Sequence, residues 1–230
     1  MVHQHRDVQG GAARAAVFGV SDGLVSNVAL ILGVAAAGTE AETILITGAS
    51  GLLAGAASMA AGEYVSMKAQ NELVERELEI ERKSLADDPH SETRELTAIY
   101  MHRGLDRSEA ELLAEAVMAD PEVALEVHAR EELGVDPESV GHPIAASFSS
   151  FVAFAIGAFL PLIPWLVGEG TAARNGSIII GMTAAAAVGA LLARFTERSI
   201  VRTAIRQVFW AALACTLTWA IGSWLGATVL

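Results

Sequence analysis

The sequence predicts an all-α membrane protein with five transmembrane helices and an acidic helical domain between the second and the third. Hydrophobic residues make up 53% of the 230 positions and the mean hydropathy is +0.43, which is more apolar than an ordinary soluble domain. Five windows reach the roughly 20 mostly apolar residues that a helix needs to cross a hydrocarbon core about 30 Å thick. The stretch between the second and third windows is hydrophilic and long enough for a small helical domain.

The five windows cover residues 15–38, 44–67, 145–168, 175–195 and 204–228, which divides the chain into segments 1–68, 69–141 and 142–230. A signal peptide beginning at Arg14 is the alternative interpretation of the first window, with "AAAGTEA" as its cleavage site. Its apolar region is longer than the 7–15 residues usual for a signal, which favours a membrane span. Pro161 and Pro164 are expected to kink the third span.

The distribution of basic residues predicts the orientation. With the N-terminus in the cytosol, five spans place on the cytosolic side Arg6, Arg14, the basic residues of the acidic segment, Arg194, Arg198, Arg202 and Arg206. Only Arg174 falls clearly outside. The positive-inside rule therefore predicts an N-in, C-out, multi-pass integral membrane protein, located in the plasma (inner) membrane if the source is prokaryotic.

The segment from Glu72 to Glu138 contains 20 acidic and 7 basic residues, a formal charge of −13, while the whole chain carries −12. Such a surface repels nucleic acid and concentrates cations, so its partner is expected to be a positive ion or a basic protein. Pro89, Gly104, Pro121 and Gly134 divide the segment into four helices, the first continuous with the second span. No strand pattern is present.

Details of these helices follow from residue type and spacing. Ser108 is a plausible cap of the third helix. Its apolar positions recur at helical spacing and are expected to face a small shared core; they are Leu112, Leu113, Ala116 and Val117. The single cysteine, Cys215, is expected to be a small packing residue in the last span.

Two carboxylates, Asp22 and Glu63, lie within or at the edge of predicted spans. A charged residue at a helix centre costs roughly 2.5–3.5 kcal/mol on insertion scales and usually faces a bundle interior or a water path. On a straight helix one stripe carries Met59, Glu63, Ser66, Gln70, Glu77 and Glu81. A methionine sulfur beside carboxylates suits a transition metal better than Mg²⁺ or Ca²⁺. The structural alternative is that Asp22 bonds a neighbouring helix and Glu63 extends to the interface.

The stretches "FGVSDGLVSNVALILGVA" and "GLLAGAASMAAGEYVSMKAQNE" resemble the first two spans of the vacuolar iron transporter family, with its S-D-G turn and S-M-A-x-G-E-[YF]-V-S motif. The later "HAREELGVDP" extends the similarity over nearly the whole chain, which is identified as a bacterial or archaeal type of member. The resemblance implies a five-span homodimer that moves Fe²⁺, and often Mn²⁺, out of the cytosol in exchange for protons. Its ions run along the dimer interface after a cytosolic glutamate-rich domain gathers them.

The resemblance also implies a set of metal ligands. The S-D-G aspartate is Asp22, the S-M-A methionine is Met59, and Glu63 is the glutamate at the cytosolic mouth. In the cytosolic domain the family's carboxylates match Glu77, Glu81, Glu92, Glu95 and Glu132, with Glu72, Glu75 and Glu79 as competing positions on the first helix. Where some members have a methionine pair, this chain has His128 and Ala129. His128 shares a helical face with Glu132, so an imidazole is expected to replace the thioether.

Together these features predict a transporter rather than an enzyme. No permanently bound cofactor is expected, and Zn²⁺ or Co²⁺ are further ions that the site would accept in vitro. Asp22 would give the ion a fixed negative ligand and take up a proton when the ion leaves. Glycine patterns at 19–23, 51–55 and 222–226 permit close helix approach, within the chain or at a dimer seam.

Two alternatives remain open. A membrane-anchored metal-binding or ferroxidase-like domain would need Glu-x-x-His pairs on separate helices, and "EVH" at 126–128 has the wrong spacing. A regulatory membrane protein whose acidic domain binds a basic partner would leave Asp22, Met59 and Glu63 unexplained.

Overall fold

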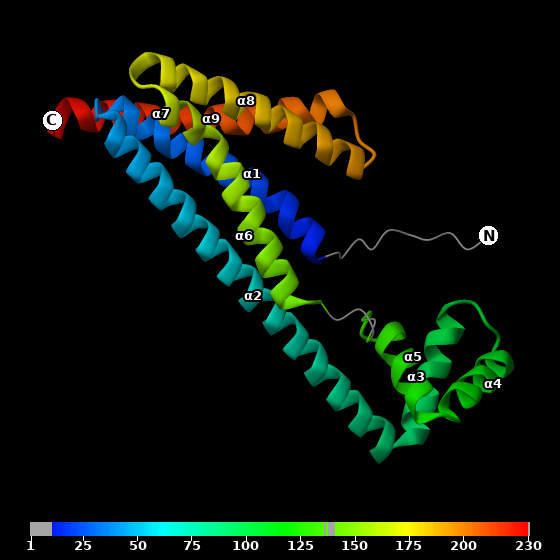
Figure 1. The fold of residues 1–230 in the computed structure, drawn as a ribbon. Coiled ribbons are helices and arrows are strands. Elements are labelled where there is room, and N and C mark those ends of the chain that lie inside the picture. Colours follow the sequence, from blue (N-terminus) through cyan, green and yellow to red (C-terminus); the bar gives the residue numbers. More distant parts are fainter. Residues whose placement is uncertain (1–10, 136, 138–140, 230) are drawn as a thin grey trace. The chain divides into compact units, whose positions relative to one another are not determined.

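Every regular element is helical in the computed structural model, which describes residues 11–135, 137 and 141–229 and contains no strand within them (Figure 1). The chain separates into two compact units. We call Met1–Val65 with His142–Leu230 the membrane unit, and Ser66–Gly141 the acidic unit. Two residues used in the sequence analysis lie outside the described residues. They are Arg6, which supports the predicted orientation, and Glu138, which is counted in the charge of the acidic segment.

Five helices are long and apolar enough to cross a membrane, as the sequence predicts; they cover Ala12–Ala36, Ala41–Asp87, Pro143–Val167, Gly170–Phe195 and Ile200–Thr228. The corresponding elements are α1 (Gly11–Ala36), α2 (Ala41–Asp87), α6 (Pro143–Phe159) with its continuation, α8 (Gly170–Phe195) and α9 (Ile200–Val229). Helix α1 packs against α6, α8 and α9. Its apolar side chains Leu24, Val28 and Ile31 are fully buried and form the centre of the membrane unit.

The α-helix of the third span is interrupted at the two prolines where the sequence predicts a kink. Helix α6 passes at Leu160–Leu162 into the 3-10 turn η1, and the chain continues as α7 (Ile163–Val167). Proline has no N–H to continue the α-helical ladder, and its ring displaces the preceding turn. The Ser177 hydroxyl of α8 donates a hydrogen bond of 2.7 Å to the Pro161 carbonyl. This bond fixes α8 against the interruption.

Glycines let the membrane helices approach one another at backbone distance. A Cβ added at Gly23 of α1 would overlap the Phe154 carbonyl of α6, and one at Gly157 of α6 would overlap the Val20 carbonyl of α1. A Cβ at Gly222 of α9 would likewise overlap the Gly33 carbonyl of α1. The predicted close approach is therefore confirmed, and it occurs between helices of one chain.

The acidic unit contains the second half of α2 and three shorter helices, α3 (Pro89–His102), α4 (Arg107–Met118) and α5 (Pro121–Glu131). An aspartate caps the start of each short helix: Asp88, Asp106 and Asp120 accept hydrogen bonds from backbone N–H groups of the first turn. Helix α2 ends at Asp87, where Pro89 begins α3. Gly104 and Gly134 adopt positive φ after α3 and α5, which ends both helices where the sequence predicts.

Two sequence predictions about α4 are wrong. Asp106, and not Ser108, caps the helix, because Asp106 and Glu109 form a reciprocal capping box that begins the helix one residue before Ser108. Leu112 and Leu113 are exposed, and the buried residues of α4 are Ala110 and Ala114. The predicted apolar face is rotated relative to the observed one, because α4 presents its small alanines to α3 and α5.

Candidate metal site

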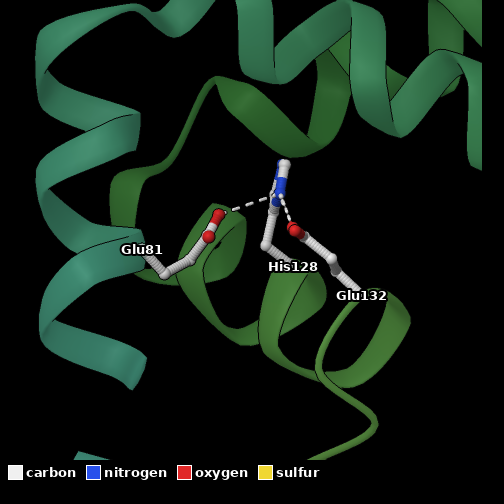
Figure 2. A group of neighbouring side chains, drawn as sticks. All are labelled: Glu81, His128 and Glu132. Atoms are coloured by element: carbon white, nitrogen blue, oxygen red, sulfur yellow. Dashed lines mark ion pairs between the residues drawn. The ribbon is translucent and has the colours of Figure 1, made fainter. Parts of the chain in front are cut away.

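Four side chains of the acidic unit form what we call the carboxylate–histidine cluster: Glu81, Glu92, His128 and Glu132. The Nδ1 atom of His128 lies 3.0 Å from a Glu81 carboxylate oxygen and 3.8 Å from one of Glu132 (Figure 2). A carboxylate oxygen of Glu92 also lies 3.8 Å from the same nitrogen. One ligand atom from each of Glu81, His128 and Glu132 can be chosen so that all three lie within 4.8 Å of one another.

Local helix structure brings these side chains together. Glu81 lies on α2, Glu92 in the first turn of α3, His128 in the last turn of α5, and Glu132 at the C-cap of α5. His128 and Glu132 are one helical turn apart, which confirms the shared face expected from their spacing. The turn at Pro89 reverses the chain between Glu81 and Glu92. Three helices thus contribute to one cluster.

Burial is unusual for so polar a group. His128 is fully buried and Glu81 is 7% exposed. Within the described residues, the Nε2 atom of His128 has no hydrogen-bond partner, and the 3.0 Å contact between its Nδ1 atom and the Oε1 atom of Glu81 lacks hydrogen-bond geometry. Unpaired buried polar atoms cost about 1–3 kcal/mol each. Such atoms are expected where a ligand completes the site.

Electrostatics within the cluster favour proton or cation uptake. Burial, together with the negative charges of Glu132, Glu92 and Glu95, raises the pKa of Glu81 from 4.5 to about 7. Burial and the charge of Glu95 also raise the pKa of Glu92, which the neighbouring His128 partly offsets. Like charges held close together disfavour ionisation until a cation compensates them. A divalent cation at this position would relieve that repulsion.

The ligand types match a divalent transition metal. Carboxylate oxygens bind Mn²⁺ and other hard cations, and a neutral imidazole nitrogen binds Fe²⁺ and Zn²⁺. The Nδ1 atom of His128 lies within 3.8 Å of oxygens from three carboxylates, which makes a mixed nitrogen and oxygen set. The cluster is therefore chemically suited to hold a metal ion, with Glu81, His128 and Glu132 as the nearest ligands.

The remaining predicted residues of the acidic unit lie around the cluster and not in it. Glu95 is exposed, yet its charge acts on both Glu81 and Glu92. Glu77 is half-buried, one turn before Glu81 on α2. The competing positions on α2 are all exposed; they are Glu72, Glu75 and Glu79. The structure thus brings together Glu81, Glu92, His128 and Glu132 out of the larger predicted set.

The predicted membrane residues are more dispersed. Asp22 of α1 is exposed, and its side chain forms no ion pair or hydrogen bond within the part of the chain that the structure describes. Met59 of α2 is half-buried and packs against the cluster of Ala56, Phe154 and Ala158. A carboxylate oxygen of Glu63 lies 3.7 Å from the Arg14 guanidinium of α1.

Arg14 and Gln207 are functional candidates that the sequence reasoning missed. Arg14 lies within ion-pair distance of Glu63, so an ion that binds this carboxylate would compete with a guanidinium. The Gln207 side chain of α9 donates a hydrogen bond to the hydroxyl of Ser21, the residue before Asp22. Both contacts join residues that are far apart in the sequence, so no local pattern predicts them. The sequence predicts only that Arg14 and Glu63 lie at the same membrane edge.

The sequence is similar to known proteins over most of its length. The VIT family model matches residues 13–223. A "Vacuolar iron transporter" from Acanthamoeba castellanii is 35% identical over 229 residues, which cover 95% of this chain and 81% of the relative. "Vacuolar iron transporter 1" from Arabidopsis thaliana is 28% identical over 206 residues, with 89% of this chain and 82% of the relative covered. These relatives are eukaryotic and are named as transporters, not enzymes. On the extent of these matches, the chain belongs to the VIT family.

Proposed function

We propose that this protein transports Fe²⁺, and also Mn²⁺, out of the cytosol in exchange for protons. The observation that carries the proposal is the carboxylate–histidine cluster, whose Glu81 and His128 are buried, in a chain whose relatives are named vacuolar iron transporters. In this proposal the acidic segment 69–141 gathers the ion, Glu63 receives it, and Asp22 and Met59 contact it in the membrane. The metal is cargo, with no permanently bound cofactor.

Proton exchange follows from the chemistry of the ligands. Carboxylates must be deprotonated to bind a metal, so binding releases protons and unbinding takes them up. The raised pKa of Glu81, about 7, means that protons compete with the cation near neutral pH. A protonated Asp22 after release of the ion would return a neutral side chain through the apolar interior at lower cost than a charged one.

The proposed orientation has the N-terminus and the acidic unit in the cytosol. Positive-inside topology supports this orientation, because one end of the predicted spans carries Arg14, Arg194, Arg198, Arg202 and Arg206, and Arg174 belongs to the other. The ion pair of Arg14 with Glu63 shows that the start of α1 and the membrane part of α2 near Glu63 meet at one end of the membrane unit. If the source is prokaryotic, this orientation corresponds to export through the plasma membrane.

We further propose a homodimer whose seam contains Asp22. This residue lies about 15 Å along α1 from Ala12, near the middle of a hydrocarbon core about 30 Å thick. A single copy would expose its carboxylate to lipid. The exposed face of α1 repeats every fourth residue, at Arg14, Phe18, Asp22, Ser26 and Leu30. Helix α2 exposes small residues that suit close packing; they are Ala54, Ala57, Ser58, Ala61 and Gly62.

Uptake into proteoliposomes tests the transport proposal. Purified protein is reconstituted with a pH gradient, and the initial uptake rates of Fe²⁺, Mn²⁺, Co²⁺ and Zn²⁺ are measured beside a lumenal pH dye. We expect fastest uptake for Fe²⁺ and Mn²⁺, with proton movement in the opposite direction. Metal binding by the protein without uptake would instead identify a membrane-anchored metal-binding protein.

Cysteine cross-linking tests the dimer. The native Cys215 is buried, so a cysteine introduced on the exposed face of α1 reports selectively. We expect Ser26→Cys to form a disulfide-linked dimer in membranes. The matched control is Ile179→Cys, on the exposed side of α8 and outside the proposed seam. Equal cross-linking at both positions would contradict a specific seam.

A further inference from the structure

A cavity of about 610 Å³ opens where α8 passes into α9. Its lining contains three arginines, Arg198, Arg202 and Arg206, together with Glu197, Ser199 and Thr203. Arg202 and Arg206 are four residues apart and lie on one face of α9, and Arg198 lies in the connection, four residues before Arg202. The connection is well fixed: the Arg198 N–H donates to the Ala193 carbonyl at 3.0 Å, and the Thr196 N–H donates to the Leu192 carbonyl at 3.0 Å.

Within the part of the chain that the structure describes, the positive charge of this cavity is only partly compensated. Among the described residues, none of its three arginines forms an ion pair, whereas Arg14 and Arg103 each pair with a glutamate. Glu197 is the one acidic residue among the described residues that line the cavity. Three guanidinium groups and one carboxylate leave a net positive cavity. Its complement is an anion with several acceptor oxygens, since guanidinium groups match phosphate geometry.

The cavity lies beside a strip of apolar side chains. Three residues after each arginine, α9 exposes Val201, Ile205 and Phe209, with 66%, 63% and 58% of their surface accessible. Because α8 and α9 are both long and apolar enough to span, their connection lies at a membrane surface. A molecule that occupies both features has a phosphate at one end and hydrocarbon at the other.

We propose that this cavity binds the phosphate headgroup of an anionic glycerophospholipid, whose acyl chains lie along Val201, Ile205 and Phe209. Basic pockets between transmembrane helices are known to hold anionic headgroups. A free phosphate ion would satisfy the arginines, but it would leave the adjoining apolar strip without a role. The lipid would join the ends of α8 and α9 at the membrane surface.

Lipid binding to the delipidated full-length protein tests this proposal. Native mass spectrometry measures the Kd of the first phosphatidylglycerol bound, with phosphatidylcholine as the zwitterionic comparison and inorganic phosphate as a competitor. The test variant is Arg202→Gln. The matched control is Arg194→Gln, which removes the same charge from the last turn of α8 but does not line the cavity. Thermal melts establish that both variants fold.

We expect phosphatidylglycerol to bind more tightly than phosphatidylcholine. Non-specific electrostatic attraction contributes about 1 kcal/mol per basic residue, which is about fivefold in affinity, and this contribution would be the same for Arg202 and Arg194. If the cavity is a specific binding site, the affinity for phosphatidylglycerol should fall at least tenfold in Arg202→Gln and much less in Arg194→Gln. Equal losses in the two variants, or no preference for phosphatidylglycerol, would overturn the proposal. Displacement of the lipid by inorganic phosphate at comparable concentration would identify a free-anion site instead. If Arg202→Gln unfolds, Arg206→Gln provides the same comparison.

Discussion

In the acidic unit, Glu81 lies 3.0 Å from His128 and shares its surroundings with Glu92 and Glu132, whereas in the membrane unit Asp22 is exposed and has no side-chain partner among the described residues. One chain is enough to assemble the first group. In the membrane unit, the proposed ligand Asp22 stands without such neighbours. Under the proposed function, one copy of the acidic unit would bind a metal ion, whereas the proposed membrane pathway would need a second copy to complete it.

Replacing Asp22 by Asn is expected to have the largest effect. The variant keeps the size of the side chain but removes the charge that offsets a dication in low dielectric, where an uncompensated charge costs roughly 3 kcal/mol on insertion scales. The initial rate of Fe²⁺ uptake into liposomes should therefore fall at least about 100-fold. Metal binding by the acidic unit should remain. Glu72→Gln, an exposed carboxylate of α2, is the control. Wild-type uptake in Asp22→Asn would contradict the proposed pathway, and loss of folding would indicate a structural role.

Replacing Glu81 by Gln tests the acidic unit. Removal of the most buried carboxylate should weaken Mn²⁺ binding to the full-length protein at least about tenfold in calorimetry. Glu79→Gln removes an exposed charge two residues away on the same helix and should have little effect. Equal weakening in the two variants would show that the whole acidic surface, and not the carboxylate–histidine cluster, attracts the ion.

Replacing Met59 by Leu should have a smaller effect. The change conserves volume, so the cost to stability is expected to stay below about 1.5 kcal/mol. The loss of the sulfur should slow Fe²⁺ uptake severalfold and leave Mn²⁺ uptake less affected, because a thioether is a soft ligand. Competition between the two ions in one liposome preparation measures the ratio. An unchanged ratio would exclude contact between the sulfur and the ion.

The pH dependence of stability is expected to show the smallest effect. Without metal, the folded protein holds a proton on Glu81 up to about pH 7, while the unfolded chain loses it near pH 4.5. The folded state therefore binds more protons between these values, so the contribution of Glu81 to stability is present at acid pH and decreases as pH rises to about 7. Melting curves of the metal-free protein should show this decrease. The slope should be shallower in Glu81→Gln, and an identical slope would remove Glu81 as its source.

Local sequence signals were sufficient to predict most of the fold. Window hydropathy identified all five spans, and Pro89, Gly104, Pro121 and Gly134 marked the ends of helices that the structure confirms. These signals depend on backbone geometry, which neighbouring residues decide. The face of α4 is different, because its burial depends on α3 and α5, so Leu112 and Leu113 were wrongly assigned to the core.

The candidate site was only partly predictable for the same reason. The spacing of His128 and Glu132 already places them on one helical face. The approach of Glu81 depends on how α2, α3 and α5 pack, which no local pattern specifies. The pairing of Arg14 with Glu63 joins residues from two helices and is visible only once α1 and α2 are folded.

The backbone contacts at Gly23, Gly157 and Gly222 have a mechanical consequence. Helices that meet through side chains can roll over one another, but α1 meets α6 and α9 with no side chain between them at these points. Sliding would drive main-chain atoms into collision, so we expect these three helices to move as one rigid body. Asp22 belongs to that body and would keep a fixed position on it. The hinges of any opening and closing motion would then lie elsewhere, for example at the proline interruption after α6.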